Sequence, residues 1–324
     1  MPSSPKAISS ATPQLGVTGR LSALFVAMRP QQWTKNLAIF VGIVFAQRLL
    51  NLISFERGVV AFVTFCLASS SIYLFNDLLD LANDRQHPKK KYRPLAAGTL
   101  PEAWAKGAIV FLWLACAGLA TGLFFMPIHE VDIFAAWGGT NFLFACTLAF
   151  YVALMILYSL RLKHVVLLDV FIIASGFALR ILAGAVAIPV SISPWLYMVT
   201  IMLSLLLALG KRRNELVLME QDASNHRQIL KEYTLPLLDQ MITIVTTATV
   251  IAYSLYTFQA NTGDHRLMIT VPLVLYGTFR YLYLIYVRKE GGSPEEVLVR
   301  DRHMLATVVV CVAIVIVVLY ALPR

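Results

Sequence analysis

Apolar stretches long enough to cross a lipid bilayer recur along the whole of this 324-residue chain, and short polar segments separate them. A transmembrane helix needs about 20 consecutive, mainly apolar residues. The pattern therefore predicts an all-α, polytopic membrane protein of about nine spans. We expect the spans at residues 36–54, 58–76, 106–126, 133–157, 165–187, 194–210, 237–258, 267–287 and 304–322. The first is the least regular, because Gln47 and Arg48 interrupt it; it could start earlier or pair with an interfacial helix over Leu21–Met28.

The composition is that of a membrane protein. Hydrophobic residues make up 58% of the chain and charged residues 14%, whereas charged residues form about 25% of a typical soluble domain. Residues 1–19 are rich in Ser, Pro and Ala and are expected to be a disordered tail. Residues 20–324 are expected to form a single membrane-embedded domain.

The placement of positive charge predicts the orientation. Most of the 27 Lys and Arg residues fall in the N-terminal tail and in alternate connections, whereas the connections near 127–132 and 188–193 contain none. Cytoplasmic connections are the ones enriched in Lys and Arg. We therefore expect a cytoplasmic N-terminus in the inner membrane of a cell. The net charge of +9 follows from this topology, and no nucleic-acid binding is expected, because the sequence has no soluble basic domain.

Three carboxylates and two amides lie within residues 76–84, where the second predicted span meets water. On a helix, Asp77, Asp80 and Asp84 are spaced i, i+3 and i+7, and Asn76 precedes Asp80 by four, so all four share one face. Carboxylates this close repel one another unless a cation lies between them. Mg²⁺ takes a few carboxylate ligands and completes its shell with substrate phosphates. The run predicts a magnesium site; the alternative is a solvated acidic helix end.

A cationic loop follows the acidic run. Within ten residues it contains Arg85, Lys89, Lys90, Lys91 and Arg93. A polyphosphate is neutralised by a metal ion together with cationic side chains. We expect Lys91 and Arg93 to bind phosphate oxygens. For Lys89 and Lys90, ordinary flanking charge or contact with anionic lipid headgroups is the alternative.

Charged residues in or beside other predicted spans are further candidates. Arg180 lies eleven residues after Asp169, three helical turns, so both would point the same way. An arginine at that depth faces a partner or a wet cavity. We expect Arg180 to face a cavity and bind a phosphate, with an internal ion pair as the alternative. For Arg280 the sequence favours neither a packing role nor a functional one. Lys211 could reach a phosphate or pair with Glu215, four residues later.

These motifs resemble a known family. The run Asn-Asp-x-x-Asp-x-x-x-Asp at 76–84, followed by Arg-Pro-Leu-Ala-Ala-Gly at 93–98, resembles the UbiA superfamily of intramembrane prenyltransferases. The segment Arg-Pro-Gln-Gln-Trp-Thr-Lys-Asn at 29–36 is similar to the start of that family's first helix. The resemblance covers roughly residues 20–322. It implies nine helices around a central cavity that opens sideways to lipid, with a cytoplasmic cap over two polar motifs.

The stretch that corresponds to the family's second motif, residues 158–169, departs from the aromatic prenyltransferases. Those carry a second aspartate-rich motif that helps to hold a prenyl diphosphate through a second metal ion. Here Asp169 is the one carboxylate, beside Arg161, Lys163 and His164. This exchange of carboxylates for cations favours an additional anion. With residues 210–215 and 291–302, the stretch is similar to the family's decaprenyl-phosphate phosphoribosyltransferase branch.

The resemblance implies a Mg²⁺-dependent transferase of cell-envelope biogenesis. It would move a 5-phosphoribosyl group from phosphoribosyl pyrophosphate to a polyprenyl phosphate and release pyrophosphate. Mg²⁺ would be held by Asn76, Asp77, Asp80 and Asp84, and the three aspartates would be catalytic. The substrates would be bound by Lys35, Lys91, Arg93, Tyr158, Lys163, Asp169, Arg180 and Lys211. The acceptor phosphate is already an anion at neutral pH, so no strong general base is needed, and in-line attack predicts inversion at the anomeric carbon. The sequence does not decide whether the protein forms a homo-oligomer.

Two other functions compete with this one. An aromatic prenyltransferase that uses a polyprenyl diphosphate would need carboxylates for a second metal ion, and the second motif offers Asp169 alone. A secondary transporter would place charged residues along its pathway. An odd number of spans, an acidic cluster at one interface and no evident pair of broken helices argue against a transporter.

Overall fold

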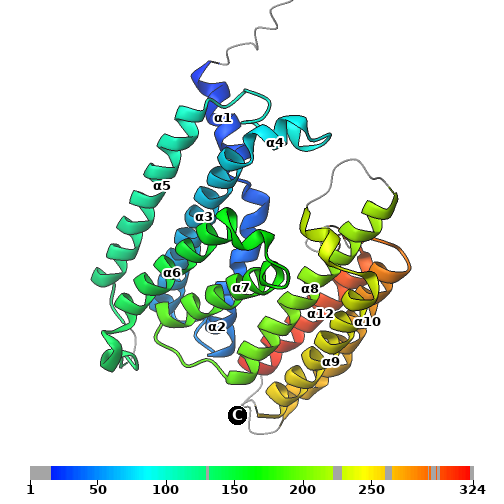
Figure 1. Ribbon diagram of the computed structural model, residues 1–324. Helices are drawn as coiled ribbons and strands as arrows, with labels where there is room; N and C mark the ends of the chain where they lie inside the picture. Colours follow the sequence, from blue (N-terminus) through cyan, green and yellow to red (C-terminus); the bar gives the residue numbers. More distant parts are fainter. Residues whose placement is uncertain are drawn as a thin grey trace, which may run out of the picture. The chain divides into compact units, whose positions relative to one another are not determined.

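A computed structural model describes residues 16–128, 131–221, 228–259, 265–290, 292, 297 and 300–321. Within these residues the chain forms helices and turns, with no strand (Figure 1). Eight helices are long and apolar enough to cross a membrane: Leu52–Leu79, Glu102–Phe125, Thr140–Leu160, Leu168–Ala187, Pro194–Leu218, Leu235–Gln259, Arg266–Tyr286 and Arg302–Ala321. They confirm the prediction of an all-α, multi-pass membrane protein and match the last eight predicted spans.

The first predicted span, 36–54, is wrong. Residues Pro30–Ala38 form the 3₁₀ segment η1, and helix α2 covers only Ile39–Phe45. Gln47 then takes a left-handed backbone conformation (φ 59°), which ends the helix. Seven residues are too few to span a bilayer. The tail boundary is also wrong, because residues 17–19 belong to helix α1 (Val17–Ala27); residues 1–15 lie outside the described residues.

The chain divides into two compact units. Unit 1 comprises residues 1–34 and 66–117, and its helices are α1, the second half of α3 (Leu52–Leu79), α4 (Leu81–Gln86) and most of α5 (Glu102–Gly122). Its core contains Leu74 of α3, Leu95 and Leu100 of the loop after α4, and Ala105 of α5. The loop is therefore packed against the helix that carries the acidic run. That the membrane domain is single stays a prediction.

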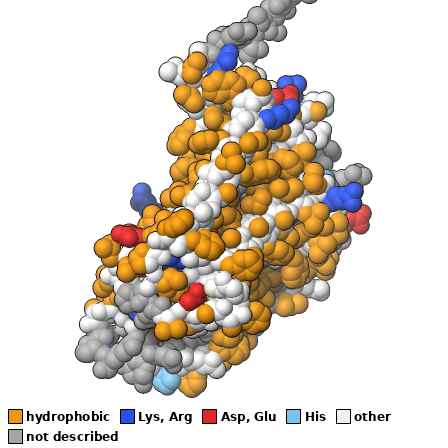
Figure 2. All heavy atoms as spheres, turned by 90° about the vertical axis from the view of Figure 1, so that its left-hand side faces the viewer, with side chains coloured by type: hydrophobic (Ala, Val, Ile, Leu, Met, Phe, Trp, Pro, Cys, Tyr) orange, Lys and Arg blue, Asp and Glu red, His pale blue; other side chains and the backbone are white. Residues whose placement is uncertain are grey.

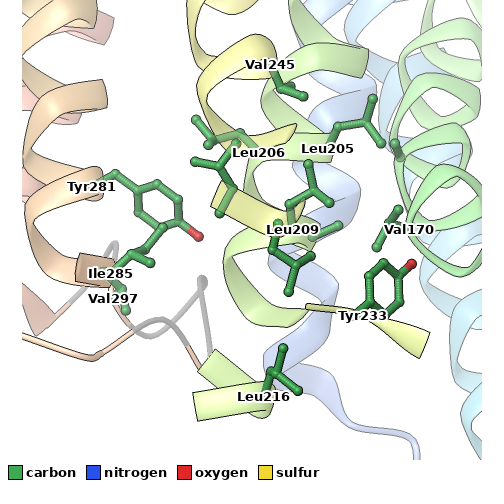
Figure 3. Packing of buried hydrophobic residues seen from close by; sticks show 14 of the residues in the cluster. Val170, Leu205, Leu206, Leu209, Leu216, Tyr233, Val245, Tyr281, Ile285 and Val297 are labelled. Atoms are coloured by element: carbon green, nitrogen blue, oxygen red, sulfur yellow. The ribbon is translucent and has the colours of Figure 1, made fainter. Parts of the chain in front are cut away.

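Unit 2 comprises residues 35–65 and 118–324. Its helices are α2, the first half of α3, α6 (Thr140–Leu160), α7 (Leu168–Ala187), α8 (Pro194–Gln221), α9 (Leu235–Gln259), α10 (Val271–Tyr286) and α12 (Arg302–Ile316), which a π-helical turn, η8 (Val317–Ala321), continues. Helix α7 packs against α2, α6 and α8, α8 packs against α9, and α10 packs against α12. Leu205 and Leu209 of α8 share a buried cluster with Val170 of α7 and Ile285 of α10 (Figure 3).

Helix α2 lies unusually close to α7. A Cβ atom added at Gly184 of α7 would stand 2.0 Å from the carbonyl oxygen of Ile39, and one at Gly42 would stand 3.4 Å from the backbone nitrogen of Ala185. At Gly184 only glycine permits this approach of one backbone to another, whereas at Gly42 a Cβ atom would make an ordinary contact. The contact holds η1, which precedes α2, beside the middle of α7.

The outer surface is suited to lipid. Figure 2 shows hydrophobic side chains over most of the face that it presents, with few charged side chains among them. Exposed large apolar residues occur along the spans, such as Phe111 and Leu114 of α5, Phe150 of α6 and Val309 of α12. A soluble protein rarely exposes so much contiguous apolar surface, whereas a bilayer accommodates it.

Candidate functional site

The acidic run lies where α3 gives way to α4. Helix α3 ends at Leu79, and Asp80 (φ −90°, ψ 5°) is the N-cap of α4. Helical hydrogen bonding nevertheless continues: the Asp80 N–H donates to the Asn76 carbonyl at 2.9 Å, and the Asp84 N–H donates to the Asp80 carbonyl at 2.8 Å. Asn76, Asp80 and Asp84 thus keep the i, i+4 and i+8 spacing that puts side chains on one face.

Asp77 and Asp84 are both buried, and arginines neutralise them. Nη1 of Arg93 lies 3.2 Å from Oδ1 of Asp77 and 2.6 Å from Oδ2 of Asp84. Nη2 of Arg29 lies 2.5 Å from the same Asp77 oxygen. Two buried carboxylates without such partners would carry a large desolvation penalty. The structure thus places Arg93 beside the acidic run, and its predicted contact with a substrate phosphate stays a prediction.

The sequence pattern alone does not assign Arg29 to this site. Its backbone is left-handed (φ 54°), directly after α1 and before Pro30. Its guanidinium also stacks over Tyr73, 4.9 Å from the ring centroid. A non-glycine residue in this conformation is uncommon and often marks a functional position. The feature of the sequence that could have indicated Arg29 is the Arg29-Pro30 pair just before the first predicted span.

The acidic run fits a magnesium ion that a substrate helps to bind. No three His, Cys, Asp or Glu side chains gather into a metal site in the described parts of the chain. The run does provide a face with one amide, Asn76, and two carboxylates, Asp80 and Asp84. One nitrogen of Arg93 already bridges Asp77 and Asp84, so a cation can occupy this position. Mg²⁺ commonly uses one or two carboxylates and takes its other ligands from water and phosphate.

The cationic loop beside the run is ordered by a histidine. Nδ1 of His87 accepts hydrogen bonds from the backbone N–H groups of Lys89 and Lys90, at 3.1 and 3.2 Å. Burial and the nearby Lys90 lower the pKa of His87, which keeps the ring neutral and able to accept. Nζ of Lys90 lies 3.8 Å from Asp84, whereas the side chain of Lys91 is exposed. Of the loop lysines, Lys90 therefore belongs to the acidic cluster.

A second charged cluster lies in unit 2, around Asp169 at the start of α7. Both of its carboxylate oxygens are engaged: Nε of Arg212 lies 2.6 Å from Oδ2, and the Tyr233 hydroxyl donates to Oδ1 at 2.7 Å. Arg212 also pairs with Glu215, and the Tyr233 hydroxyl accepts the N–H of Leu167 at 2.9 Å. The sequence did not indicate Arg212 or Tyr233.

Tyr233 joins two parts of unit 2. Its ring belongs to the hydrophobic core with Val170 (Figure 3), while its hydroxyl donates to Asp169. Burial, followed by the hydrogen bond to Asp169, raises the pKa of Tyr233, so the hydroxyl stays protonated and keeps donating. The segment before α9 is thereby fixed to the start of α7. In this arrangement Asp169 is fully buried, and its predicted contact with ribose stays a prediction.

Several predicted substrate residues lie near the same ends of α6, α7 and α8. Tyr158 is half-buried in the last turn of α6, and Lys163 is half-buried in the 3₁₀ turn η5 (Leu162–His164) that follows. Lys211 is exposed on α8, next to Arg212. Lys35 is half-buried in η1. Tyr158, Lys163 and Lys211 thus lie on the same three elements, or next to them, as Asp169 and Arg212. Lys35 lies in a different segment, η1.

Arg180 is buried in the middle of α7 among neutral groups. Its Nε donates to Oδ1 of Asn36 at 2.7 Å, and its Nη2 donates to the Tyr151 hydroxyl at 2.8 Å. The guanidinium also lies over the rings of Tyr151 and Phe177. Asp169 pairs instead with Arg212 and Tyr233, and the predicted phosphate contact of Arg180 stays a prediction. Arg180 instead ties η1 to α6 and α7.

Arg280 has a structural partner. It forms a two-pronged ion pair with Asp301, with Nε 3.2 Å from Oδ1 and Nη2 2.7 Å from Oδ2. Asp301 also caps α12 by accepting the N–H of Met304 at 2.8 Å. The hydrogen bonds from Arg280 lower the pKa of Asp301. The described contacts therefore favour packing for Arg280. Residues 291, 293–296, 298 and 299 of the predicted 291–302 marker lie outside the described residues.

Comparison with known proteins places these features in a family. Residues 36–298 match the model of the UbiA prenyltransferase family. A protein of Corynebacterium glutamicum named decaprenyl-phosphate phosphoribosyltransferase is 32% identical over 92% of this chain and 86% of its own length. A protein of the same name from Mycolicibacterium smegmatis is 35% identical over 87% of each chain.

Solved structures share the fold. A UbiA homolog from Archaeoglobus fulgidus bound to DMAPP and Mg²⁺ aligns with a TM-score of 0.66 and 16% identity, over 93% of this chain and all of that one. A digeranylgeranylglyceryl phosphate synthase aligns with a TM-score of 0.63 and 17% identity, over 94% of this chain and 99% of that one. At this level of identity, the likeness concerns the fold alone.

Proposed function

From the premise that this chain is a transferase belonging to the UbiA prenyltransferase family, we propose that it transfers 5-phosphoribosyl from phosphoribosyl pyrophosphate to a polyprenyl phosphate. The relatives that are similar over nearly the whole chain carry the name decaprenyl-phosphate phosphoribosyltransferase. The reaction forms a bond between an acceptor phosphate oxygen and the anomeric carbon. The bond from that carbon to pyrophosphate breaks, and pyrophosphate leaves.

The observation that carries the proposal is the state of Asp169. It is the carboxylate that stands where prenyl diphosphate enzymes of this family need a second metal ligand. Its two oxygens are bound by Arg212 and Tyr233. With Asp169 engaged in this way, we assign the neighbouring Lys163 to an anion of the substrate and place no second metal ion here. Phosphoribosyl pyrophosphate carries a 5-phosphate in addition to its diphosphate, whereas a prenyl diphosphate has no such group.

We assign the metal to the first acidic run. Asn76, Asp80 and Asp84 would hold Mg²⁺, which when bound would neutralise charge on the leaving pyrophosphate. Asp77 holds Arg29 and Arg93 in place. These two arginines and Lys91 would bind the remaining diphosphate oxygens through charge-assisted hydrogen bonds. Catalysis by this chain then consists of positioning and charge neutralisation, and no side chain has to remove a proton from the acceptor.

Arg180 is assigned to an anionic substrate group. A cation at this depth is costly unless an anion or a polar cavity compensates it. Asn36 and Tyr151, its described hydrogen-bond partners, are neutral. The acceptor phosphate is the group that would balance this charge.

The proposal extends to the orientation of the chain in the membrane and to its oligomeric state. The Lys- and Arg-rich connections support a cytoplasmic acidic run and N-terminus, with the chain in the inner membrane. Soluble phosphoribosyl pyrophosphate would then reach its site from the cytoplasm. Assembly into a homo-oligomer is compatible with this arrangement.

The test is a charge reversal in the second motif. Lys163→Glu should raise the KM for phosphoribosyl pyrophosphate at least tenfold, because repulsion of a partly buried phosphate costs more than the roughly 0.2–1 kcal/mol of an exposed ion pair. Arg161→Glu is the matched control, since Arg161 is exposed two residues away, and should change KM less than threefold. Equal KM values for both variants and the parent protein would remove Lys163 from donor binding.

A further inference from the structure

Arg180 has one guanidinium nitrogen, Nη1, that makes no hydrogen bond within the part of the chain that the structure describes. Its Nε is bonded to Asn36 and its Nη2 to Tyr151. Arg180 is only 7% exposed, and polar groups buried to this extent are normally hydrogen-bonded. Nη1 is not among the polar atoms that are both enclosed and without a partner, so it borders an accessible space. Its two N–H groups therefore remain for a ligand.

The guanidinium is directed toward the Asp169 end of α7. Side chains on a helix point back toward its N-terminus. Accordingly, Nη1 of Arg180 lies 3.3 Å from the position that a Cβ atom of Gly176 would take, one turn nearer to Asp169. Asp169 lies about 10 Å further along the same helix. Nη1 thus faces the part of unit 2 that contains the second charged cluster.

Gly176 keeps the space beside Nη1 open. A Cβ atom there would also stand 3.2 Å from Cε of Met155, so both distances would be tighter than ordinary van der Waals contacts. Glycine inside a helix is less favourable than alanine, and Gly176 is not among the described glycines with a positive φ. The backbone conformation therefore does not require glycine here, whereas the position of the Arg180 guanidinium does.

The groups around the guanidinium leave its charge uncompensated. The Asn36 amide and the Tyr151 hydroxyl are neutral, and so are the rings of Tyr151 and Phe177, over which the guanidinium lies. A buried cation without an anion is costly in an apolar medium. Guanidinium N–H groups form strong, charge-assisted hydrogen bonds with phosphate oxygens. A phosphate at Nη1 would satisfy both the charge and the remaining donors.

We propose that Asn36 and Tyr151 are positioning residues that hold the Arg180 guanidinium with Nη1 facing the phosphate group of the lipid acceptor. Gly176 leaves room for that group. The neutrality of Asn36 is part of the arrangement, because a carboxylate there would neutralise the cation and repel the phosphate. The inference rests on the proposed function, since it takes the acceptor phosphate as the anion. A phosphate carried by a lipid reaches this depth with its chain in an apolar environment.

The experiment compares two lipids that differ by one phosphate group. Decaprenyl phosphate and decaprenol are titrated separately, without donor, into the full chain in detergent, and binding is followed by native mass spectrometry. Asn36→Asp keeps the shape of the side chain and an acceptor for Nε of Arg180, but adds a negative charge. It should weaken binding of decaprenyl phosphate at least about tenfold, through repulsion and neutralisation, and leave binding of decaprenol unchanged. If Arg180 were only structural, it would gain an ion-pair partner, and both lipids would bind as they do to the parent protein.

Two milder variants keep the proposal testable if the first one does not fold. Gly176→Ala crowds Nη1 and should weaken binding of decaprenyl phosphate about fivefold; Gly118→Ala is the matched control, because a Cβ atom there meets nothing within 4 Å. Tyr151→Phe keeps the ring but removes the acceptor of Nη2, and should weaken it about threefold. Tyr253→Phe, which removes another buried and hydrogen-bonded hydroxyl, should bind as the parent does. Binding of decaprenol should stay unchanged in all four.

Three results would overturn the proposal. The first is unchanged binding of decaprenyl phosphate in the folded variants of Asn36, Tyr151 and Gly176. The second is equal weakening for both lipids, which would restrict these residues to a structural role. The third is weaker binding of phosphoribosyl pyrophosphate with unchanged binding of decaprenyl phosphate, which would assign Arg180 to the donor.

Failure of the proposed function would look different. The parent protein would then bind decaprenyl phosphate more tightly than decaprenol, and the variants would remove this preference, yet no phosphoribosyl group would be transferred. That result would contradict the reaction and would still support a lipid phosphate site at Nη1 of Arg180.

Discussion

Nη1 of Arg93 lies 2.6 Å from Oδ2 of Asp84, and this ion pair joins the cationic loop to the acidic run. The same nitrogen also contacts Asp77. The loop therefore neutralises buried carboxylates within unit 1. A bound divalent cation and the guanidinium would compete for Asp84, which makes Arg93 sensitive to both metal and diphosphate.

Replacing Arg93 by Gln should expose this competition. Loss of the guanidinium leaves two buried carboxylates less well compensated and should destabilise the fold by about 1–3 kcal/mol, since Arg29 and Lys90 remain. Millimolar Mg²⁺ should then raise the thermal unfolding midpoint in detergent more for Arg93→Gln than for the parent protein. Arg93→Lys is the matched control, because it keeps the charge. Equal Mg²⁺ shifts in all three proteins would contradict a shared cation position.

Asp80 should be required for turnover. It lies at the break between α3 and α4, on the face that we assign to Mg²⁺. Asp80→Ala should lower kcat at least a hundredfold while the protein stays folded, because a ligand of the assigned metal is lost. Excess chelator should abolish turnover of the parent protein as well. Full activity of the folded variant, or turnover in chelator, would rule out the metal assignment.

Tyr233 should act by positioning Asp169 and Arg212. Tyr233→Phe removes a buried hydroxyl that bonds Asp169 and the Leu167 N–H, which should cost about 1–3 kcal/mol of stability. If the cluster orients the nearby cations, KM for the donor should rise severalfold while kcat falls less than twofold. Steady-state kinetics with varied donor separates the two. A loss of stability with unchanged KM would restrict Tyr233 to a structural role.

Asp301 should matter for stability alone. Asp301→Ala removes the cap of α12 and the partner of Arg280, and we expect a loss of about 1–2 kcal/mol with unchanged turnover. The folded pKa of Asp301 is lowered, so its contribution is present above the unfolded value of about 3.9 and is lost as pH falls through the folded pKa. The unfolding free energies of the parent and of Asp301→Asn should therefore differ at pH 6 and draw together as the pH is lowered below about 3.9 toward about 2. Parallel curves would contradict this linkage.

The sequence predicted features that depend on local composition. Spans of about 20 apolar residues follow from hydropathy alone, and eight of the expected helices are present. The failed span, 36–54, looked apolar enough, but the left-handed turn at Gln47 and the close packing of α2 on α7 decide its structure. A hydropathy pattern does not encode the close backbone approach at Gly184 or the left-handed turn at Gln47.

Long-range partners were beyond the reach of the sequence. Asn36 and Arg180 are 144 residues apart, and Asp169 and Tyr233 are 64 apart. Each pair depends on how helices pack, which no local spacing encodes. The acidic run was recognisable because its members lie within little more than two helical turns. Arg29, which follows α1 and pairs with Asp77, lies 48 residues away in the sequence.

The most direct test of the proposed function is a transfer assay with the purified chain in detergent. Phosphoribosyl pyrophosphate labelled in the ribose, supplied with Mg²⁺ and decaprenyl phosphate, should yield a labelled, acid-labile lipid and stoichiometric pyrophosphate. A polyprenyl diphosphate supplied with 4-hydroxybenzoate should yield no prenylated product. Prenylation of the aromatic acid without phosphoribosyl transfer would contradict the account.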